Sequence, residues 1–233
     1  MPAPYRAYAI GVPSRDTTVF TSSMAGQTGP LAGTHRRRPR FPEESWKAQV
    51  RAYRVGMNIC VFLSAADLDE RYTAPAREFA GLLGKAGHTL VWGGSDTGLM
   101  KVVADGVQEA GGRLVGVSVD FLAAKARPNA DEMTITGDLA ERKALLLAKS
   151  DAIVVMVGGT GTLDEATEIL ELKKHAKHTK PVVVLNTAGF YDGLRTQFQR
   201  MEDEGFLPRP LADLAFFAED GRTALAHLER QLS

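Results

Sequence analysis

The chain has 233 residues, which is enough for one domain of ordinary size with an appended segment, or for two very small domains. Its 28 Lys and Arg residues balance 28 Asp and Glu residues, and a net charge of zero argues against a general nucleic-acid-binding protein. No run of eighteen apolar residues is present, so no membrane-spanning helix is expected, and the amino terminus lacks the apolar segment of a secretory signal. The single cysteine, Cys60, excludes an internal disulfide and suits a buried strand in a reducing compartment. We therefore expect a cytoplasmic protein that binds neither nucleic acid nor membranes.

Residues 1–55 differ in composition from the rest of the chain. They are rich in Pro, Gly, Ser and Thr, show no apolar periodicity, and contain a basic cluster at 35–40. A solvated tail explains this cluster better than a nucleic-acid or membrane tether, because neither aromatic residues nor an amphipathic helix accompany it. The sequence predicts a flexible N-terminal extension over 1–55 and one folded domain over 56–233.

From residue 58 onward, short apolar runs alternate with segments of helical period. The runs predicted as strands are 58–64, 88–92, 113–119, 151–157, 181–185 and 214–217. The segments predicted as helices are 72–85, 98–110, 138–149, 162–177, 189–204 and 222–232. Continuous apolar runs are typical of strands covered on both faces. The predicted fold is therefore α/β, a Rossmann-like doubly wound, mostly parallel sheet flanked by helices, with ligands expected beyond the carboxyl ends of the strands.

Two glycine-rich turns, 93–100 and 157–162, each follow a predicted strand and open a predicted helix. Unpaired N–H groups and the helix dipole at such a turn favour an anion, and phosphate is the natural guest. Neither turn matches GxGxxG or the Gly-Lys-Ser/Thr of a P-loop, which disfavours a dehydrogenase or an ATPase. One such turn alone is as well explained as a tight connection, whereas two together favour a phosphate site.

Charged residues near these helix starts have structural explanations too. Thr162 to Glu165 matches a capping box, with Thr162 as N-cap and Glu165 reaching back to it. Asp138 is a candidate N-cap of the preceding helix, and Arg142 either pairs with Asp138 one turn away or serves an anionic ligand. Both explanations of Arg142 remain open from the residues alone. His175 and His178 lie three residues apart on a predicted helix, a spacing that could hold a metal ion. Because lysines surround both histidines, we expect no metal site there.

Three motifs together resemble the LOG (Lonely Guy) family, and the resemblance covers 58–232. The segment 93–100, followed by Ala-Asp at 104–105 and Ala-Gly-Gly at 110–112, is similar to the family's GGGxxGLM…AD…AGG segment. Glu-Arg-Lys at 141–143 looks like its ERK element, and Gly-Gly-Thr-Gly-Thr-Leu-Asp-Glu at 158–165 looks like its PGGxGTxxE motif. The spacing of 23 residues between Arg142 and Glu165 also agrees.

The resemblance implies that 56–233 is a nucleotide-binding catalytic domain with a Rossmann-like fold and the activity of a cytokinin riboside 5'-monophosphate phosphoribohydrolase. Such an enzyme cleaves the N-glycosidic bond of N6-modified adenosine 5'-monophosphates, or of AMP, to free base and ribose 5-phosphate. Carried over, Arg142 and Glu165 form the catalytic pair. The implied substrate- and phosphate-binding residues are Gly94, Met100, Lys143, Gly158, Gly159, Thr160, Gly161 and Thr162. The resemblance implies no cofactor and no metal, a nucleoside monophosphate as ligand, and self-association into a dimer or higher homo-oligomer.

The sequence departs from the family pattern at two places in the expected pocket. Val157 stands where the family has proline, and the first strand ends in Phe-Leu-Ser-Ala-Ala at 62–66 rather than in a CGSS-like turn. These departures motivate an alternative, a non-catalytic protein of the same fold that binds or senses a nucleotide or the molybdenum cofactor.

Overall fold

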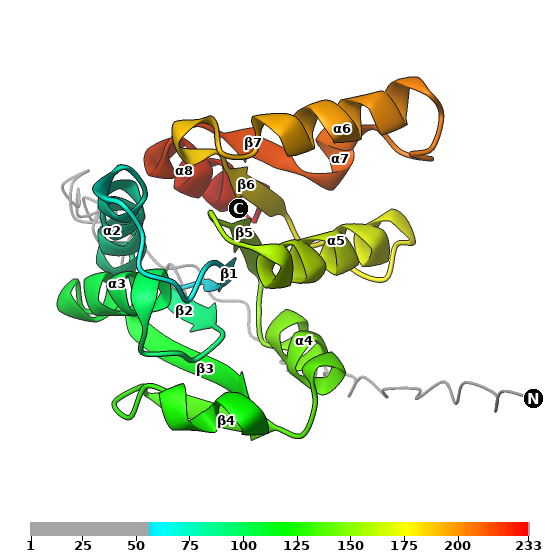
Figure 1. Cartoon of the computed structure of the whole chain (residues 1–233). Coiled ribbons are helices and arrows are strands. Elements are labelled where there is room, and N and C mark those ends of the chain that lie inside the picture. The colour runs from blue at the N-terminus through cyan, green and yellow to red at the C-terminus, as the bar shows by residue number, and fades with distance from the viewer. Residues whose placement is uncertain (1–55, 233) are drawn as a thin grey trace, which may run out of the picture. The chain divides into compact units, whose positions relative to one another are not determined.

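A seven-stranded, all-parallel sheet forms the centre of the domain (Figure 1). The computed structural model describes residues 56–232, so the predicted flexible extension over 1–55 lies outside the described residues, and its boundary stays a prediction. The strand order is β4-β3-β2-β1-β5-β6-β7. The strands are β1 (Asn58–Phe62), β2 (Thr89–Trp92), β3 (Arg113–Val119), β4 (Glu132–Thr136), β5 (Ala152–Val155), β6 (Val182–Leu185) and β7 (Phe216–Ala218). The predicted Rossmann-like parallel sheet is confirmed.

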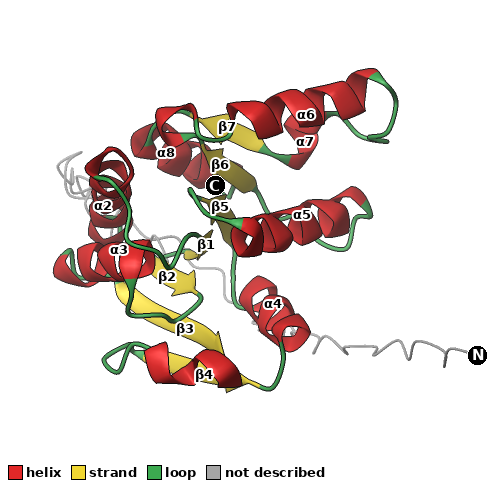
Figure 2. Cartoon of the chain, viewed as in Figure 1, coloured by secondary structure: helices red, strands yellow, loops and turns green. Residues whose placement is uncertain are grey.

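Helices cover both faces of the sheet (Figure 2). One face carries α2 (Glu70–Lys85), α3 (Gly98–Glu109) and α8 (Gly221–Gln231), which pack with the buried side chains of β1 and β2 into one apolar cluster. The other face carries α4 (Leu139–Ala148), α5 (Thr160–Lys174) and α6 (Asp192–Asp203), which contribute to a second cluster. Short elements complete the chain: the 3₁₀ turns η1 (Asp120–Lys125) and η2 (Thr187–Gly189), and the one-turn helix α7 (Leu211–Leu214).

The segment 120–137 is where sequence patterns failed. It contains η1 and the edge strand β4, neither of which was predicted. Among the strands within 56–232, β4 pairs only with β3, and it is half-buried over most of its length, so it needs no continuous apolar run. Near the carboxyl end, the predicted strand 214–217 is present as β7 but begins two residues later, at Phe216, because Leu214 still belongs to the short helix α7, on which Leu211 and Leu214 turn inward.

Cys60 is fully buried in β1, as expected, and burial raises the pKa of its thiol well above the usual range. No helix within 56–232 combines the length and the apolar character that crossing a membrane requires.

The topology places one crevice at the carboxyl edge of the sheet. Strands β1 and β5 are hydrogen-bonded neighbours, with Phe62 opposite Val155. The helix that follows β1 packs on one face of the sheet, and the helix that follows β5 packs on the other. This is a topological switch point, where ligands bind in doubly wound folds.

Candidate functional site

Backbone hydrogen bonds join three turns at the switch point. The amide of Ser64, just after β1, donates to the carbonyl of Val157 after β5 at 3.0 Å. The carbonyl of Ser64 in turn accepts from the amide of Met100, in the first turn of α3, at 3.2 Å. Segments that lie far apart in the sequence therefore meet at one place.

A cavity of about 360 Å³ opens at this meeting point. Its walls come from the turns that follow β1 and β5 and from the starts of α3, α4 and α5, together with η1. The lining residues are Leu63, Ser64, Ala65, Met100, Phe121, Leu122, Leu139, Arg142, Lys143, Gly159, Gly161, Thr162, Asp164 and Glu165. Its size falls within the range of small-molecule sites in proteins.

A buried ion pair lies in the wall of this cavity. Nη1 of Arg142 on α4 donates to Oε1 of Glu165 on α5 at 2.5 Å, and both side chains are about nine-tenths buried, with 10% and 9% exposed. Nε of Arg142 donates to the carbonyl of Val117 in β3 at 3.0 Å, which holds the guanidinium in place. Gly93 makes room for it, because a Cβ at that position would collide with Nη2 of Arg142.

Burial and the neighbouring charges set the ionisation of Glu165. Burial raises the pKa of this carboxyl, while the charge and the hydrogen bond of Arg142 oppose the rise. Asp164, its neighbour in sequence, raises the pKa further. A buried carboxyl with a raised pKa and a fixed cationic partner, facing a cavity, has the character of a general acid or base.

The start of α5 differs from the predicted capping box. The helix begins at Thr160 with Gly159 as N-cap, and no side chain of the described residues caps it. The assignment of Thr162 as N-cap and of Glu165 as its reciprocal partner was therefore wrong. Because the glycine-rich turn already enters the helical conformation, α5 starts two residues earlier, and its first amides lack partners within the helix. Such a helix start binds anions readily.

Gly158 allows the chain to close over the first turn of α5. A Cβ at Gly158 would collide with the side chain of Thr162, whereas a Cβ at Gly159 or Gly161 would meet no atom of the described residues within 4 Å. The last two glycines line the cavity and leave its floor open to a ligand. Glycine is thus required at 158 by packing, and at 159 and 161 it permits close approach.

Lys143 lies beside the ion pair. Its ammonium donates to Asp164 at 2.9 Å and also pairs with Glu168, and both partners lie on α5. The hydrogen bond to Glu168 is the main reason that the pKa of Lys143 is raised. The lysine thus stays charged where it lines the cavity.

The first turn of α4 resolves the open question about Arg142. Asp138 is the N-cap, as predicted, and its carboxylate accepts from the amide of Glu141 at 2.8 Å. The alternative i,i+4 ion pair between Asp138 and Arg142 was wrong, because the guanidinium turns inward and pairs with Glu165.

The structure brings most, but not all, of the sequence-predicted site residues to the cavity. Met100, Arg142, Lys143, Gly159, Gly161, Thr162 and Glu165 line it. Gly94, Gly158 and Thr160 do not. Gly94 lies in the left-handed region with φ +76° and is packed near Met133 and Ser118, so its role is to shape the turn.

Three apolar residues that line the cavity were not predicted from the sequence. Phe121 and Leu122 on η1 and Leu139 at the start of α4 are 67%, 39% and 47% exposed. Phe121 and Leu122 stand in a segment without apolar periodicity, and Leu139 opens a helix whose periodicity does not indicate which residues face a cavity. His175 pairs with Glu171 at 2.9 Å, and within 56–232 no group of three potential metal ligands was found.

Comparison with known proteins places these features in context. Residues 100–228 match the sequence model of a family described as "Possible lysine decarboxylase". The chain is 34% identical over 174 residues to a probable cytokinin riboside 5'-monophosphate phosphoribohydrolase of Oryza sativa subsp. japonica, which covers 73% of this chain and 77% of the relative. It is 33% identical over 151 residues to the cytokinin riboside 5'-monophosphate phosphoribohydrolase of Mycobacterium tuberculosis, and this match covers 64% of this chain and 81% of the relative. The structure of the Moco carrier protein from Chlamydomonas reinhardtii superposes with a TM-score of 0.58 at 27% identity, covering 76% and 98%.

Proposed function

The chain belongs to the LOG family, whose sequence model carries the description "Possible lysine decarboxylase", and from this premise we propose that it hydrolyses nucleoside 5'-monophosphates. The substrates are N6-modified adenosine 5'-monophosphates or AMP. Water adds to the anomeric carbon of the ribose, the bond to the base nitrogen breaks, and the products are the free base and ribose 5-phosphate. The names of the relatives in Oryza sativa and Mycobacterium tuberculosis support this reaction.

The observation that carries the proposal is the buried Arg142–Glu165 pair beside the uncapped start of α5. Cleavage of a ribosyl–nitrogen bond develops positive charge on the sugar, which a nearby carboxylate stabilises. Oε1 of Glu165 is held by Arg142, and among the described residues no group donates a hydrogen bond to Oε2. We assign Oε2 the task of orienting the attacking water and accepting its proton.

The same geometry supports roles for the other lining residues. The substrate phosphate binds at the turn 158–162, where the amides that open α5 lack helical partners. Lys143 supplies a second positive charge on that side of the cavity. Met100 offers an apolar surface to the sugar or base, while Gly94 shapes the neighbouring turn. Binding the phosphate away from the reacting centre positions the ribose for attack.

A product assay tests the proposal. Purified protein is incubated with AMP and with isopentenyladenosine 5'-monophosphate, and the free base is measured by chromatography. Glu165→Gln should lower the rate by a factor of about 10² to 10⁴, the usual contribution of a general base. Glu171→Gln is the matched control, since Glu171 lies on the same helix but is exposed and outside the cavity. If wild type releases no base, or if both variants behave alike, the proposal fails.

A second candidate function is non-catalytic binding of a nucleotide or of the molybdenum cofactor. The likeness to the Chlamydomonas reinhardtii Moco carrier protein favours it, as does the altered first turn at 62–66. Calorimetry distinguishes the two. Tight nucleotide binding without turnover, unchanged in Glu165→Gln, supports the carrier.

We also infer that two copies of the chain associate through the mouth of the cavity. Phe121, Leu122 and Leu139 form an exposed apolar rim there, and such surfaces mark protein interaction sites. Sedimentation analysis should show a dimer or a higher homo-oligomer, and Phe121→Ser should weaken it. An unchanged assembly in this variant would place the interface elsewhere. A cytoplasmic location is part of the proposal, since a lone buried cysteine suits a reducing compartment, and cell fractionation tests it.

A further inference from the structure

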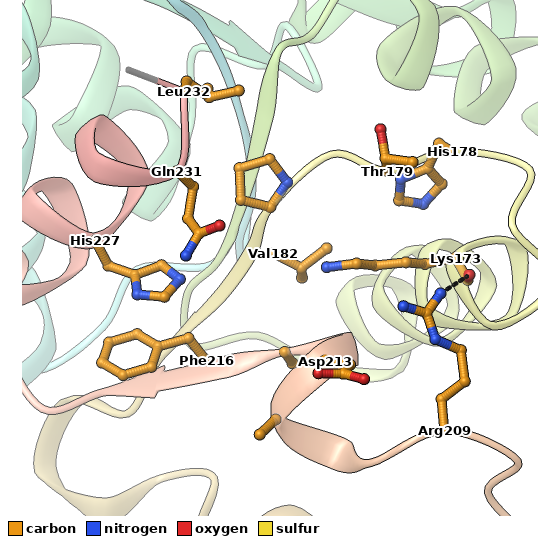
Figure 3. A pocket seen from close by; sticks show the side chains of 13 residues that line it. Lys173, His178, Thr179, Val182, Arg209, Asp213, Phe216, His227, Gln231 and Leu232 are labelled. Carbon is orange, nitrogen blue, oxygen red and sulfur yellow. Dashed lines mark hydrogen bonds between the residues drawn. The ribbon is translucent and has the colours of Figure 1, made fainter.

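A second cavity lies at the opposite edge of the sheet from the candidate active site. It has a volume of about 470 Å³ and opens beside Pro181 and Val182, at the amino end of β6, and beside Phe216, which begins β7 (Figure 3). Its walls come from the carboxyl-terminal ends of α5 and α8 and from the segment around α7. None of its lining residues lines the candidate active site.

Two cations face this cavity without a carboxylate partner among the residues that the structure describes. Lys173, at the end of α5, is only 9% exposed, and its ammonium donates one hydrogen bond, to the carbonyl of Leu214 at 3.1 Å. Arg209 donates one N–H to the carbonyl of Lys173 at 3.4 Å (Figure 3). Within 56–232, no Asp or Glu oxygen lies within 4.0 Å of the charged nitrogens of either side chain.

The arrangement is electrostatically incomplete. A buried ammonium has lost its hydration and retains two N–H donors besides the one given to Leu214. Burial and the nearby charge of Arg209 lower the pKa of Lys173, and Asp213, which also lines the cavity, opposes this only from beyond ion-pair distance. An anion in the cavity would compensate both cations and use their remaining donors.

The rest of the cavity suits a ligand larger than a bare ion. The rings of Phe216 and His227 stack in parallel, with centroids 4.1 Å apart, and both residues line the cavity. Thr179 and Gln231 add polar side chains at its rim (Figure 3). A cavity of this volume accommodates a small organic molecule rather than an oxyanion alone.

We propose that this cavity is a second binding site, for a small metabolite whose phosphate or carboxylate group lies between Lys173 and Arg209. The oxyanion accepts hydrogen bonds from the ammonium and the guanidinium, and the organic part of the ligand lies along the Phe216–His227 stack. The inference does not rest on the catalytic proposal, because the two cavities share no residue.

Histidine proton resonances test the proposal locally. The full-length protein has five histidines, and His227 is assigned by the loss of its signal in His227→Asn. Inorganic phosphate and citrate are titrated separately at constant pH and ionic strength. In the wild type, the His227 signal should shift saturably. The apparent Kd should rise about tenfold or more in both Lys173→Met and Arg209→Gln, because each variant loses a charged hydrogen-bond donor. Phosphate bound only at the start of α5 would leave the His227 signal in place.

Lys177→Met is the matched control. Lys177 lies four residues after Lys173, is exposed and does not line the cavity, so the variant removes the same charge from the same region. It should bind as the wild type does. A shift with phosphate alone would assign the site to phosphorylated ligands, and a shift with citrate alone to carboxylates. No shift at about 10 mM of either probe, or an equal weakening in all three variants, would overturn the proposal.

Discussion

Removing Arg142 should destabilise the protein in a way that depends on pH. The variant Arg142→Met keeps most of the side-chain volume but leaves the carboxyl of Glu165 buried without its cationic partner. In the wild type, Arg142 lowers the pKa of Glu165 through its charge and through its hydrogen bond, against the larger effect of burial. Without Arg142, the folded-state pKa of Glu165 rises further.

The magnitude follows from linkage. Glu165 has an ordinary pKa of 4.5, and the folded state of the variant can avoid a buried, unpaired charge by taking up a proton. Keeping Glu165 protonated in the folded state costs about 1.4 kcal/mol of stability for each pH unit above its ordinary pKa. This cost reaches at most about 3.4 kcal/mol at pH 7 and about 0.7 kcal/mol at pH 5. The wild type already bears part of this cost, because its own Glu165 pKa is raised. Loss of the hydrogen bond to Val117 adds about 1 kcal/mol at either pH.

The sign is fixed by the direction of the shift. A carboxyl whose folded-state pKa is raised contributes fully to the stability of the fold below its unfolded-state pKa. That contribution to stability is lost as the pH rises through the folded-state pKa. The destabilisation of Arg142→Met should therefore be small near pH 5 and grow towards pH 7.

Urea unfolding at the two pH values measures this difference. Arg113→Met is the matched control, because Arg113 is exposed and its contact with Glu132 is long, at 3.8 Å. It should change the free energy of unfolding by no more than about 0.5 kcal/mol at either pH. A loss of stability in Arg142→Met that is equal at both pH values, or larger at pH 5, would refute the electrostatic account of the pair.

Three further outcomes follow from the glycine turn, the α4 cap and the buried thiol. Gly158→Ala should lower the free energy of unfolding by about 1–3 kcal/mol, because its Cβ would collide with Thr162. Gly161→Ala should keep or raise stability while hindering the binding of the substrate phosphate. Thermal denaturation measures the first effect and the product assay the second. Asp138→Ala should cost about 1 kcal/mol through loss of the N-cap of α4, and an unchanged urea midpoint would contradict that role. Cys60 should not react with a thiol reagent in the native state and should react on unfolding, since burial raises its pKa; rapid labelling of the folded protein would count against this.

The sequence predicted those parts of the fold where one local pattern decides the structure. Apolar runs such as 151–157 form central strands because a strand covered on both faces must be apolar along its whole length. The edge strand β4 and the turn η1 had no such constraint and went unpredicted. Phe121, on η1, reaches the cavity only through tertiary packing, which no local pattern encodes.

Local sequence patterns also failed to predict the contact between Arg142 and Glu165. Arg142 and Glu165 each had a sufficient local explanation, an i,i+4 pair and a capping box, and both explanations were wrong. The explanation of Arg142 failed because its guanidinium turns inward, and that of Glu165 failed because of where α5 begins. Since α5 begins at Thr160 rather than at Thr162, Glu165 lies in the second turn of the helix, where it cannot serve the amino-terminal cap. The switch point between β1 and β5 then sets α4 and α5 so that the two side chains meet. A helix that starts two residues early therefore does two things at once. It leaves its first amides without helical partners, and it frees Glu165 from the cap, as the proposed role of this carboxyl in the reaction requires.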